Sequence, residues 1–424
     1  MPLTSPSTHR PEVPVSAVRP DHPPLTSADW DHRLGALLDP DAPGAAARGV
    51  APGSAWWVGG VDGPLSRGAV GRQGTDRRDA SISVHTPFRW SSVTKPVVAA
   101  LALALLDEGT LTLDAPVDRW LPELADRRVL SEPLTPDTDV ATAGTVPARR
   151  PILVRDVLEF RLGWGMDFTG PWPDPLLVAM AGAGLAAGPP APQVNPEPDE
   201  WLRRLGRFPL ARQPGEQWRY HTGASVLGVL LARAGGAPLP ELLQRRVLGP
   251  VGMTGTAFWA DADRLGPHWA PAAGPDPRTP ALACYDPADG QWSRPPAFPD
   301  AGDGLVGPVD DLAALARTLL AGGVTPDGRR VLSTGVVAAA TRSRIGPIDQ
   351  DGAGWGLGMG VRHSATPDGR SAGSFGWDGG MGASWWVDPT TGRIGVLATN
   401  LLWSSPQPPP VFGEFWSLAF GGSI

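Results

Sequence analysis

The order of expected strands and helices along the 424 residues is the feature that most constrains the fold. Short runs bounded by glycines and turn residues predict two early strands, over residues 54–60 and 68–74. Similar runs predict late strands over residues 354–361, 373–377, 382–387 and 393–400. Apolar helical stretches fill most of the chain between them. We therefore predict an α+β fold: one antiparallel sheet built from both ends of the chain, flanked by helices and carrying an inserted, mostly helical domain.

This order predicts three parts. Residues 1–27 form an N-terminal segment, residues 28–110 and 320–424 together form a discontinuous sheet domain, and residues 111–319 form a helical domain. The N-terminal segment is rich in proline and is expected to be extended or disordered. In the helical domain, residues 131–150 and 165–200 carry no clear periodicity. They could form lid loops over a pocket, and plain loops are an equally good interpretation.

Composition and charge argue against several classes of protein. The formal net charge of −7 does not favour a basic surface for nucleic acid. Cys284 is the only cysteine, so an internal disulfide is ruled out. Residues 1–40 show no signal-peptide core and no apolar run is long enough for a membrane span, so we expect a cytoplasmic protein without a membrane partner. Seven scattered histidines and the absence of His-Glu-x-x-His predict neither a metal site nor a cofactor.

Lys95 is the only lysine, although lysine and arginine together number 36. Arginine stays protonated in proteins, whereas a buried lysine can act as a base. Ser92 stands three residues earlier, and a helix expected up to residue 106 would bring both side chains onto one face. Ser-x-x-Lys is therefore a candidate nucleophile-and-base pair. Taken alone the motif is weak, because about one lysine in fifteen has a serine at that spacing by chance.

Tyr220 is one of only two tyrosines and lies in a polar loop ahead of an apolar helix. A phenolate beside an ammonium group could serve as a general base. An aromatic ring that packs the helix start is the alternative, and the pairing with Ser92 and Lys95 favours the catalytic interpretation. The neighbouring His221 is expected to face solvent or to lie behind the catalytic residues.

Four glycines crowd residues 374–383, just before and within an expected hairpin. Such a backbone lets a substrate approach closely. A free N–H group there, together with the N–H of Ser92, would form a two-donor oxyanion hole. A simple glycine-rich hairpin explains this stretch when it is considered alone.

Together, Ser92-Val-Thr-Lys95, Tyr220-His-Thr222 and Trp377-Asp-Gly379 resemble the serine β-lactamase-like superfamily. The chain is most similar to its class C-type branch, which shares the penicillin-binding-protein-like fold and includes the family VIII carboxylesterases. Further matching segments are residues 109–117, 214–216, 248–253 and 302–305, within a resemblance that spans residues 45–400. The resemblance implies that Ser92 is acylated, that Lys95 takes its proton and that Tyr220 is a base or proton shuttle. It also implies an oxyanion hole made of the N–H groups of Ser92 and Gly380.

Two departures from the superfamily pattern bear on the substrate. Thr222 stands where class C β-lactamases have asparagine, and Trp377-Asp378-Gly379 replaces Lys-Thr-Gly. The tryptophan removes a cation that helps to hold the β-lactam carboxylate. This favours an esterase and disfavours efficient β-lactam hydrolysis, while slow turnover of β-lactams stays open.

We expect a serine hydrolase of carboxylesterase type that acts on a small-molecule ester or acyl substrate. An acyltransferase or transesterase, a D-peptidase or weak β-lactamase, and a catalytically silent ligand-binding protein are competing interpretations. No Gly-x-Ser-x-Gly motif supports an α/β-hydrolase, and the sequence does not indicate the oligomeric state. The expected substrate contacts are Trp164, Trp172, Thr222, Trp377, Asp378, Gly379 and Trp385.

Overall fold

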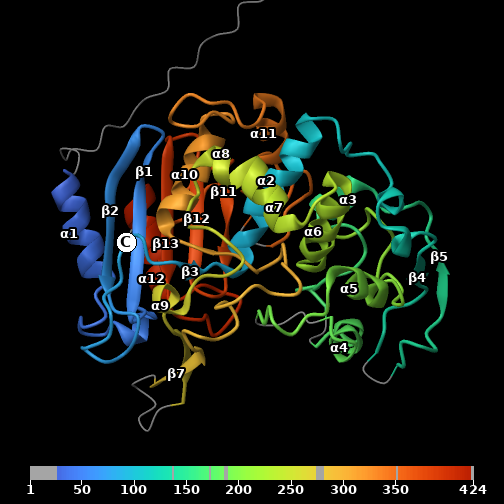
Figure 1. Cartoon of the computed structure of the whole chain (residues 1–424), viewed down its shortest axis with the longest axis horizontal. Coiled ribbons are helices and arrows are strands. Elements are labelled where there is room, and N and C mark those ends of the chain that lie inside the picture. Colours follow the sequence, from blue (N-terminus) through green and yellow to red (C-terminus); the bar gives the residue numbers. More distant parts are fainter. Residues whose placement is uncertain are drawn as a thin grey trace, which may run out of the picture.

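The computed structural model describes residues 26–135, 138–170, 173–185, 190–273, 281–349 and 352–421. Its centre is a seven-stranded antiparallel sheet in the order β2-β1-β13-β12-β11-β10-β9 (Figure 1). The strands are β1 (Gly53–Gly60), β2 (Gly63–Gly71), β9 (Ala353–Trp355), β10 (Gly360–Arg362), β11 (Phe375–Gly379), β12 (Ala383–Asp388) and β13 (Arg393–Thr399). The predicted α+β class, with helices flanking an antiparallel sheet, is confirmed.

The two ends of the chain meet inside this sheet. Strand β1 pairs with β13, and Ser54 lies opposite Thr399. Period-two alternation along β1 directs Trp56 to one face and Trp57 to the other. The Trp56 face is covered by α1 (Ser27–Leu37) and α12 (Pro410–Phe420), and their buried side chains form a separate apolar cluster.

The opposite face packs against the main core, whose central element is α2 (Thr94–Asp107). Every residue of α2 from Thr94 to Leu105 is buried, because alanine, valine and leucine occupy almost all of its positions. The 3₁₀ turn η2 (Ser91–Val93) leads directly into this helix. The remaining α-helices are α3 (Val154–Leu158), α4 (Pro175–Gly182), α5 (Pro198–Leu205), α6 (Thr222–Gly235), α7 (Leu239–Leu243), α8 (Gly249–Val251), α9 (Ala262–Leu265), α10 (Val309–Leu320) and α11 (Thr334–Ala340).

Short helical turns and strand pairs complete the described part of the chain. The pairs are β3 (Phe88–Arg89) with β8 (Val306–Gly307), β4 (Arg128–Leu130) with β5 (Thr145–Pro147), and β6 (His268–Ala272) with β7 (Ala281–Asp286). The turns are 3₁₀ helices η1 (Ala46–Arg48), η3 (Val117–Arg119) and η4 (Pro122–Leu124), and the π-helix η5 (Gln244–Leu248).

Several elements differ from the sequence-based expectations. The strand expected over residues 354–361 is split into β9 and β10 by a turn in which Gly358 has a φ of +81°. The strand pair β6 and β7 lies in a part of the chain for which no strand was expected, and the candidate lid over 165–200 contains helix α4. Helix α10, assigned to the helical domain, packs on strands β1, β12 and β13 of the sheet. Most of the proline-rich segment lies outside the described residues.

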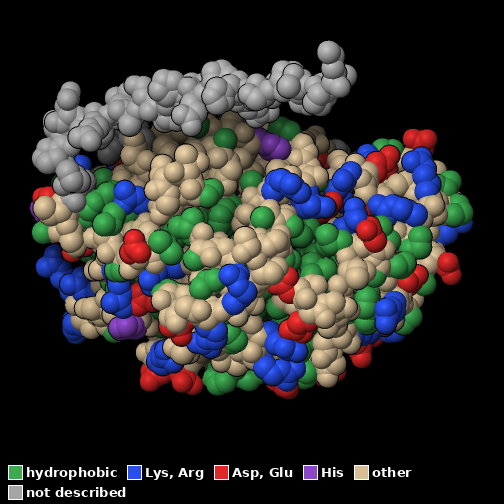
Figure 2. Space-filling view, turned by 90° about the horizontal axis from the view of Figure 1, so that it is seen from above, with side chains coloured by type: hydrophobic (Ala, Val, Ile, Leu, Met, Phe, Trp, Pro, Cys, Tyr) green, Lys and Arg blue, Asp and Glu red, His purple; other side chains and the backbone are tan. Residues whose placement is uncertain are grey.

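The surface carries charges of both signs. On the face seen in Figure 2, arginine side chains are interleaved with acidic ones. Among the described residues, no single helix is long and apolar enough to cross a membrane. By length and composition alone, the bent pair Thr222–Gly235 and Leu239–Val251 meets that criterion, with a bend of 78°.

Candidate active site

Ser92 and Lys95 lie on one face at the start of α2, as their spacing predicted. The Nζ atom of Lys95 lies 2.8 Å from Oγ of Ser92, within hydrogen-bond distance. Lys95 is only 2% exposed, whereas Ser92 keeps partial access to solvent. Ser91 has a φ of +48°, a left-handed conformation that is uncommon outside glycine, and it turns the chain sharply into the helix. Such local strain persists where the surrounding structure holds the backbone.

The residue before this turn is held on both its backbone and its side chain. The backbone N–H of Trp90 donates to the carbonyl of Leu305 at 3.0 Å. Its indole N–H donates to the carbonyl of Gly307 at 2.9 Å, and the ring is completely buried. The backbone just before Ser92 is therefore held firmly in place.

Lys95 has two further polar neighbours besides Ser92. Nζ donates to the carbonyl of Gly302 at 2.7 Å and lies 3.3 Å from Nδ1 of His221. It also lies 4.7 Å from the centre of the Tyr220 ring, within cation–π range. The amine is thus surrounded by residues from α2, the 300–304 turn and the loop before α6.

Tyr220 is held in that loop by paired backbone hydrogen bonds with Met166, at 2.8 and 2.9 Å. Its hydroxyl oxygen accepts a hydrogen bond of 2.7 Å from the indole N–H of Trp377 on β11. The tryptophan that replaces a lysine of the superfamily pattern therefore contacts the candidate base directly.

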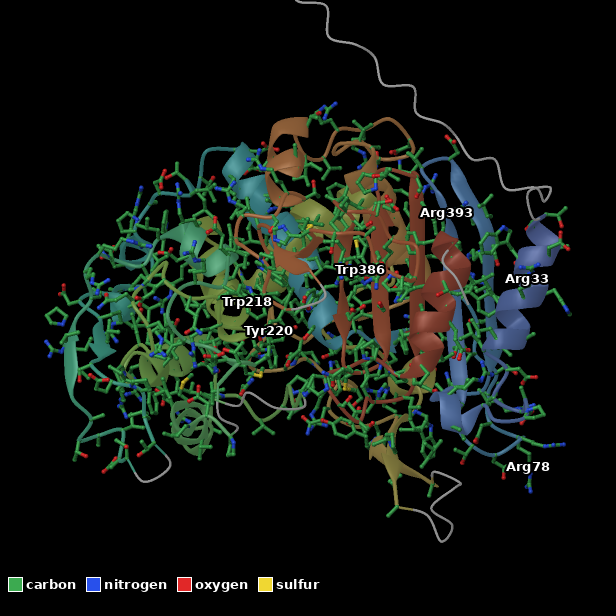
Figure 3. The ribbon with its side chains drawn as sticks, turned by 180° about the vertical axis from the view of Figure 1, so that it is seen from behind. Arg33, Arg78, Trp218, Tyr220, Trp386 and Arg393 are labelled. Atoms are coloured by element: carbon green, nitrogen blue, oxygen red, sulfur yellow. The ribbon has the colours of Figure 1, made fainter. Side chains whose placement is uncertain are left out.

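An aromatic cluster, which the sequence did not predict, surrounds the Tyr220 ring. Its members are Phe160, Phe168, Trp218, Tyr220, Trp355 and Trp377, whose neighbouring rings lie 4.6 to 6.5 Å apart. Figure 3 shows Trp218 and Tyr220 side by side near the middle of the molecule. These residues come from five separate segments, so no local sequence pattern marks them as a group.

The end of β11 lies against the turn that carries Ser92. A Cβ atom added to Gly379 would lie 2.1 Å from the carbonyl oxygen of Trp90 and 3.3 Å from the backbone nitrogen of Ser92. The carbonyl of Gly379 accepts from the N–H of Gly382 at 2.8 Å. Because C=O and N–H point in opposite directions across a trans peptide, the N–H of Gly380 points away from Gly382. A Cβ on Gly380 would meet open space.

The structure does not bring all the expected substrate contacts to Ser92. Trp164 and Trp385 are completely buried in the main core, and the indole N–H of Trp164 donates to the carbonyl of Pro209. Asp378 lies on the other face of the sheet, because alternation directs it away from Trp377, and it accepts hydrogen bonds from Ser384 and from Trp386 at 3.0 Å. Thr222 begins α6 and is 3% exposed. Trp172 lies outside the described residues.

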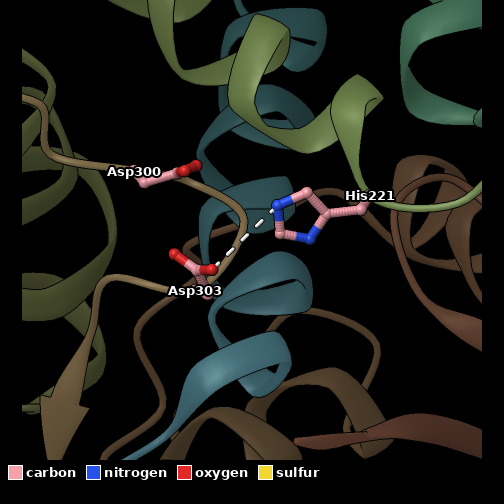
Figure 4. Close-up of side chains that lie close together, drawn as sticks. All are labelled: His221, Asp300 and Asp303. Atoms are coloured by element: carbon pink, nitrogen blue, oxygen red, sulfur yellow. Dashed lines mark ion pairs between the residues drawn. The ribbon is translucent and has the colours of Figure 1, made fainter. Parts of the chain in front are cut away.

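Of the two positions expected for His221, the structure has the one behind the candidate catalytic residues, because the ring is buried beside Lys95. Its ring lies next to two buried carboxylates, Asp300 and Asp303, and the ligand atoms of the three residues are all within 4.8 Å of one another (Figure 4). Burial, followed by the nearby Lys95 charge, lowers the pKa of His221 well below 6.5. Burial raises the pKa of Asp300, and burial together with the Asp300 charge raises the pKa of Asp303 well above 3.8.

These three residue types are ones that could hold a metal ion, which the sequence did not lead us to expect. Residues 302–305 matched the superfamily pattern, but no local sequence pattern indicated that this turn reaches Lys95. The amine of Lys95 lies 3.3 Å from His221. Whenever this amine is protonated, a divalent cation in the cluster would sit close to a second positive charge, which disfavours its binding.

A pocket of about 470 Å³ adjoins the aromatic cluster. Phe168 and Trp218 form part of its wall, together with Ile345, Arg161 and Arg344. Ser92, Lys95 and Tyr220 do not line this pocket, but two of its lining residues, Phe168 and Trp218, also contact the Tyr220 ring. Phe168 is 56% exposed, which is unusual for a large apolar side chain and leaves its face available to a ligand.

The chain matches known proteins by family profile, by sequence and by structure. The Beta-lactamase family profile matches residues 31–408. Protein Rv1367c of Mycobacterium tuberculosis is 35% identical over 330 residues, which cover 73% of this chain and 76% of that protein. Esterase EstB of Burkholderia gladioli is 30% identical over 348 residues, covering 76% of this chain and 80% of the esterase.

The fold comparison agrees with these sequence matches. The structure of EstCE1, described as a hydrolase with promiscuous acyltransferase activity, superposes with a TM-score of 0.74 at 23% identity, over 92% of this chain and 100% of that one. The family profile covers the chain from α1 to the segment after β13. The resemblance inferred from the three sequence motifs is confirmed: the chain belongs to the Beta-lactamase family, within the serine β-lactamase-like superfamily and near its esterases.

Proposed function

We propose that this chain is a serine hydrolase of carboxylesterase type that works through an acyl-enzyme on Ser92. Lys95 takes the proton of the Ser92 hydroxyl, and Tyr220 serves as an acid–base partner. The N–H groups of Ser92 and Gly380 bind the oxyanion. Membership in a family that contains an esterase relative at 30% identity supports the reaction class.

The observation that carries the proposal is the 2.8 Å contact between Nζ of the buried Lys95 and Oγ of Ser92. A nucleophile within hydrogen-bond reach of a base is the basic requirement for covalent catalysis by serine. In acylation, Oγ bonds to the ester carbonyl carbon while its proton passes to Nζ of Lys95, a step for which this amine must be unprotonated. The alcohol then leaves with the proton that Lys95 took up. Water attacks the acyl-enzyme by the same route, which releases the acid and restores Ser92.

The aromatic cluster supports an apolar group on the ester. Phe168 and Trp218 form a wall of the neighbouring pocket and lie 5.7 and 5.6 Å from the Tyr220 ring. Small-molecule sites are mostly apolar with a few placed polar groups. We therefore propose small esters with an aromatic or aliphatic acyl or alcohol group as the substrate class.

Intact-protein mass spectrometry tests the proposal. The protein is incubated with p-nitrophenyl butyrate and, separately, with a fluorophosphonate, as wild type and as Ser92→Ala. One adduct in the wild type, absent from Ser92→Ala, is expected together with nitrophenol release. Ser91→Gly is the matched control, because glycine tolerates the positive φ and the nucleophile stays in place. An adduct that persists in Ser92→Ala, or none in wild type, would refute the assignment.

Acyl transfer is a second candidate function for the same residues. The apolar wall beside Tyr220 could seat an alcohol in place of water, and the fold neighbour EstCE1 is described as having promiscuous acyltransferase activity. Adding primary alcohols during turnover and measuring the ratio of new ester to free acid distinguishes transfer from hydrolysis.

Simple assays separate an esterase from a silent binding protein, a D-peptidase and a weak β-lactamase. Lys95→Arg is expected to abolish turnover in an enzyme and to leave ligand affinity nearly unchanged in a silent binding protein. D-peptide and β-lactam panels test the D-peptidase and weak β-lactamase activities. The cytoplasmic location expected from the sequence stays a prediction.

A further inference from the structure

The three buried side chains His221, Asp300 and Asp303, here called the His221 cluster, lie directly beside Lys95. Figure 4 shows the imidazole of His221 and the carboxylate of Asp303 facing each other, with Asp300 on the same turn as Asp303. Their exposed fractions are 7%, 4% and 8%. Buried ionisable groups are costly unless they are paired, so a packed cluster next to a nucleophile requires an explanation.

Asp300 fixes the turn that contacts Lys95. Its Oδ1 atom accepts from the N–H of Gly302 at 2.7 Å and from the hydroxyl of Ser225 on α6 at 2.8 Å. The carbonyl of the same Gly302 accepts from Nζ of Lys95 at 2.7 Å. Asp300 therefore anchors the carbonyl that holds one N–H of the lysine.

The backbone of His221 is bent so that its ring reaches Lys95. Its φ of +81° and ψ of −64° place it at the centre of a γ-turn, in which the N–H of Thr222 donates to the carbonyl of Tyr220 at 3.2 Å. This conformation is strained for any residue with a side chain. The turn sends the side chains of Tyr220 and His221 to two sides of the same amine.

The contacts of His221 determine where its single ring hydrogen sits. Nδ1 lies 3.3 Å from Nζ of Lys95, so it can accept an N–H of the lysine only if it carries no hydrogen. The neutral ring then carries its hydrogen on Nε2, which faces Oδ2 of Asp303 at 4.0 Å. This distance is too long for a hydrogen bond, and an ionised Asp303 favours by charge alone the tautomer that presents an acceptor to Lys95.

We propose that His221 is a positioning residue that, with the carbonyl of Gly302, aims the lone pair of Lys95 at Ser92. A neutral amine has two N–H groups and one lone pair. When the two N–H groups are held by Gly302 and Nδ1 of His221, the lone pair is left for Oγ of Ser92, the third polar atom at hydrogen-bond distance among the described residues. This inference rests on the proposed function and extends it, because it states how the base is oriented.

Metal binding is the competing role for the same three side chains. To ligate a cation through Nε2, His221 must carry its hydrogen on Nδ1. That N–H would then point at the N–H groups of Lys95, and the acceptor would be lost. Lone-pair positioning uses all three side chains without this conflict.

The first test is a pair of substitutions with opposite expectations. His221→Leu fills the site but removes the acceptor, and we expect kcat for p-nitrophenyl butyrate to fall about 100-fold with KM nearly unchanged, because the base loses its orientation. His221→Asn places a carbonyl oxygen where Nδ1 stood and tolerates a positive φ, so kcat within about fivefold of wild type is expected. The exposed His32 supplies matched controls, His32→Leu and His32→Asn.

The outcomes separate this inference from the proposed function. If wild type forms no Ser92 adduct, the proposed function itself fails. If wild type is acylated but His221→Leu is fully active, or His221→Asn is as impaired as His221→Leu with both variants folded, only the positioning role is refuted.

A second test needs no variant of the site to stay active. With ¹⁵N-labelled histidine, the ring nitrogens of His221 are assigned by their loss in His221→Asn, and the Nε2–H tautomer is expected at neutral pH. An Nδ1–H tautomer or an imidazolium would overturn the proposal. So would a one-to-one Zn²⁺ complex that raises the wild-type Tm and is lost in His221→Asn.

Discussion

Gly379 offers the sharpest test of how the oxyanion donors are held. Gly379→Ala would put a methyl group 2.1 Å from the carbonyl oxygen of Trp90. Ordinary contacts of a Cβ atom begin near 3.4 Å, so the strand and the turn must separate by about 1 Å. Trp90 cannot yield easily, because its ring is completely buried and its backbone and indole N–H groups are both bonded.

The displacement must therefore be taken up by the end of β11, which carries Gly380 away from Ser92. A misplacement of about 1 Å can lower the rate about 100-fold, and overpacking of this kind costs about 1–3 kcal/mol of stability. We expect kcat for p-nitrophenyl butyrate to fall by about that factor, with a lower Tm.

Gly413→Ala is the matched control, because its Cβ would meet open space on helix α12 and alanine favours helix. The assay compares kcat, KM and Tm for both variants with wild type. A Gly379→Ala enzyme with kcat within about threefold of wild type would refute the close approach as the reason for glycine.

Three further expectations concern the aromatic cluster and a buried acid. Trp377→Phe removes the N–H that Tyr220 accepts, and we expect kcat to fall about 10-fold with little change in Tm, since a hydrogen bond contributes about 1 kcal/mol; an unchanged kcat would show that this contact is dispensable. Phe168→Ala is expected to raise KM about fivefold for benzoate esters but not for acetates, and equal changes for both would argue against a role in the acyl pocket. Burial raises the pKa of Asp311 from 3.8 to about 6, so the native state keeps this proton to higher pH than the unfolded state. Wild type should therefore lose at most about 3 kcal/mol of unfolding free energy as pH rises from about 4 to 7, and Asp311→Asn should lack that loss in urea titrations; parallel pH curves would contradict it.

A further variant controls for the Trp377 expectation. Trp386→Phe also removes an indole N–H, but that group bonds Asp378 on the opposite face of the sheet. Its kcat should match wild type, so a fall in both variants would indicate a general effect on the sheet.

Much of the fold, and the grouping of Ser92, Lys95 and Tyr220, could be predicted because their signals are local. Glycine-bounded strand patterns at both ends indicated the antiparallel sheet, and the unique lysine three residues after a serine pointed to the start of α2. The hairpin of β6 and β7 was missed because its residues lack alternation. Trp164 and Trp385 were assigned to the pocket because a sequence cannot tell a core tryptophan from one that lines a site.

The His221 cluster could not be predicted for a different reason. His221 is about 80 residues away in sequence from Asp300 and Asp303. Only the packing of the 300–304 turn against α2 and α6 brings the histidine and the two aspartates together. His221 also looked like a polar loop residue, and nothing local indicated that a γ-turn would bury it.

The pairing of β1 with β13 has a consequence for how the protein is made. Ser92 and Lys95 are synthesised early, whereas Gly379 and Gly380 leave the ribosome almost 300 residues later. Until those late strands join the sheet, Ser92 lacks the second of the two oxyanion donors that we propose, and Tyr220 has no Trp377 beside it. A nascent or C-terminally truncated chain should therefore be inert, so that acylation of Ser92 reports completed folding.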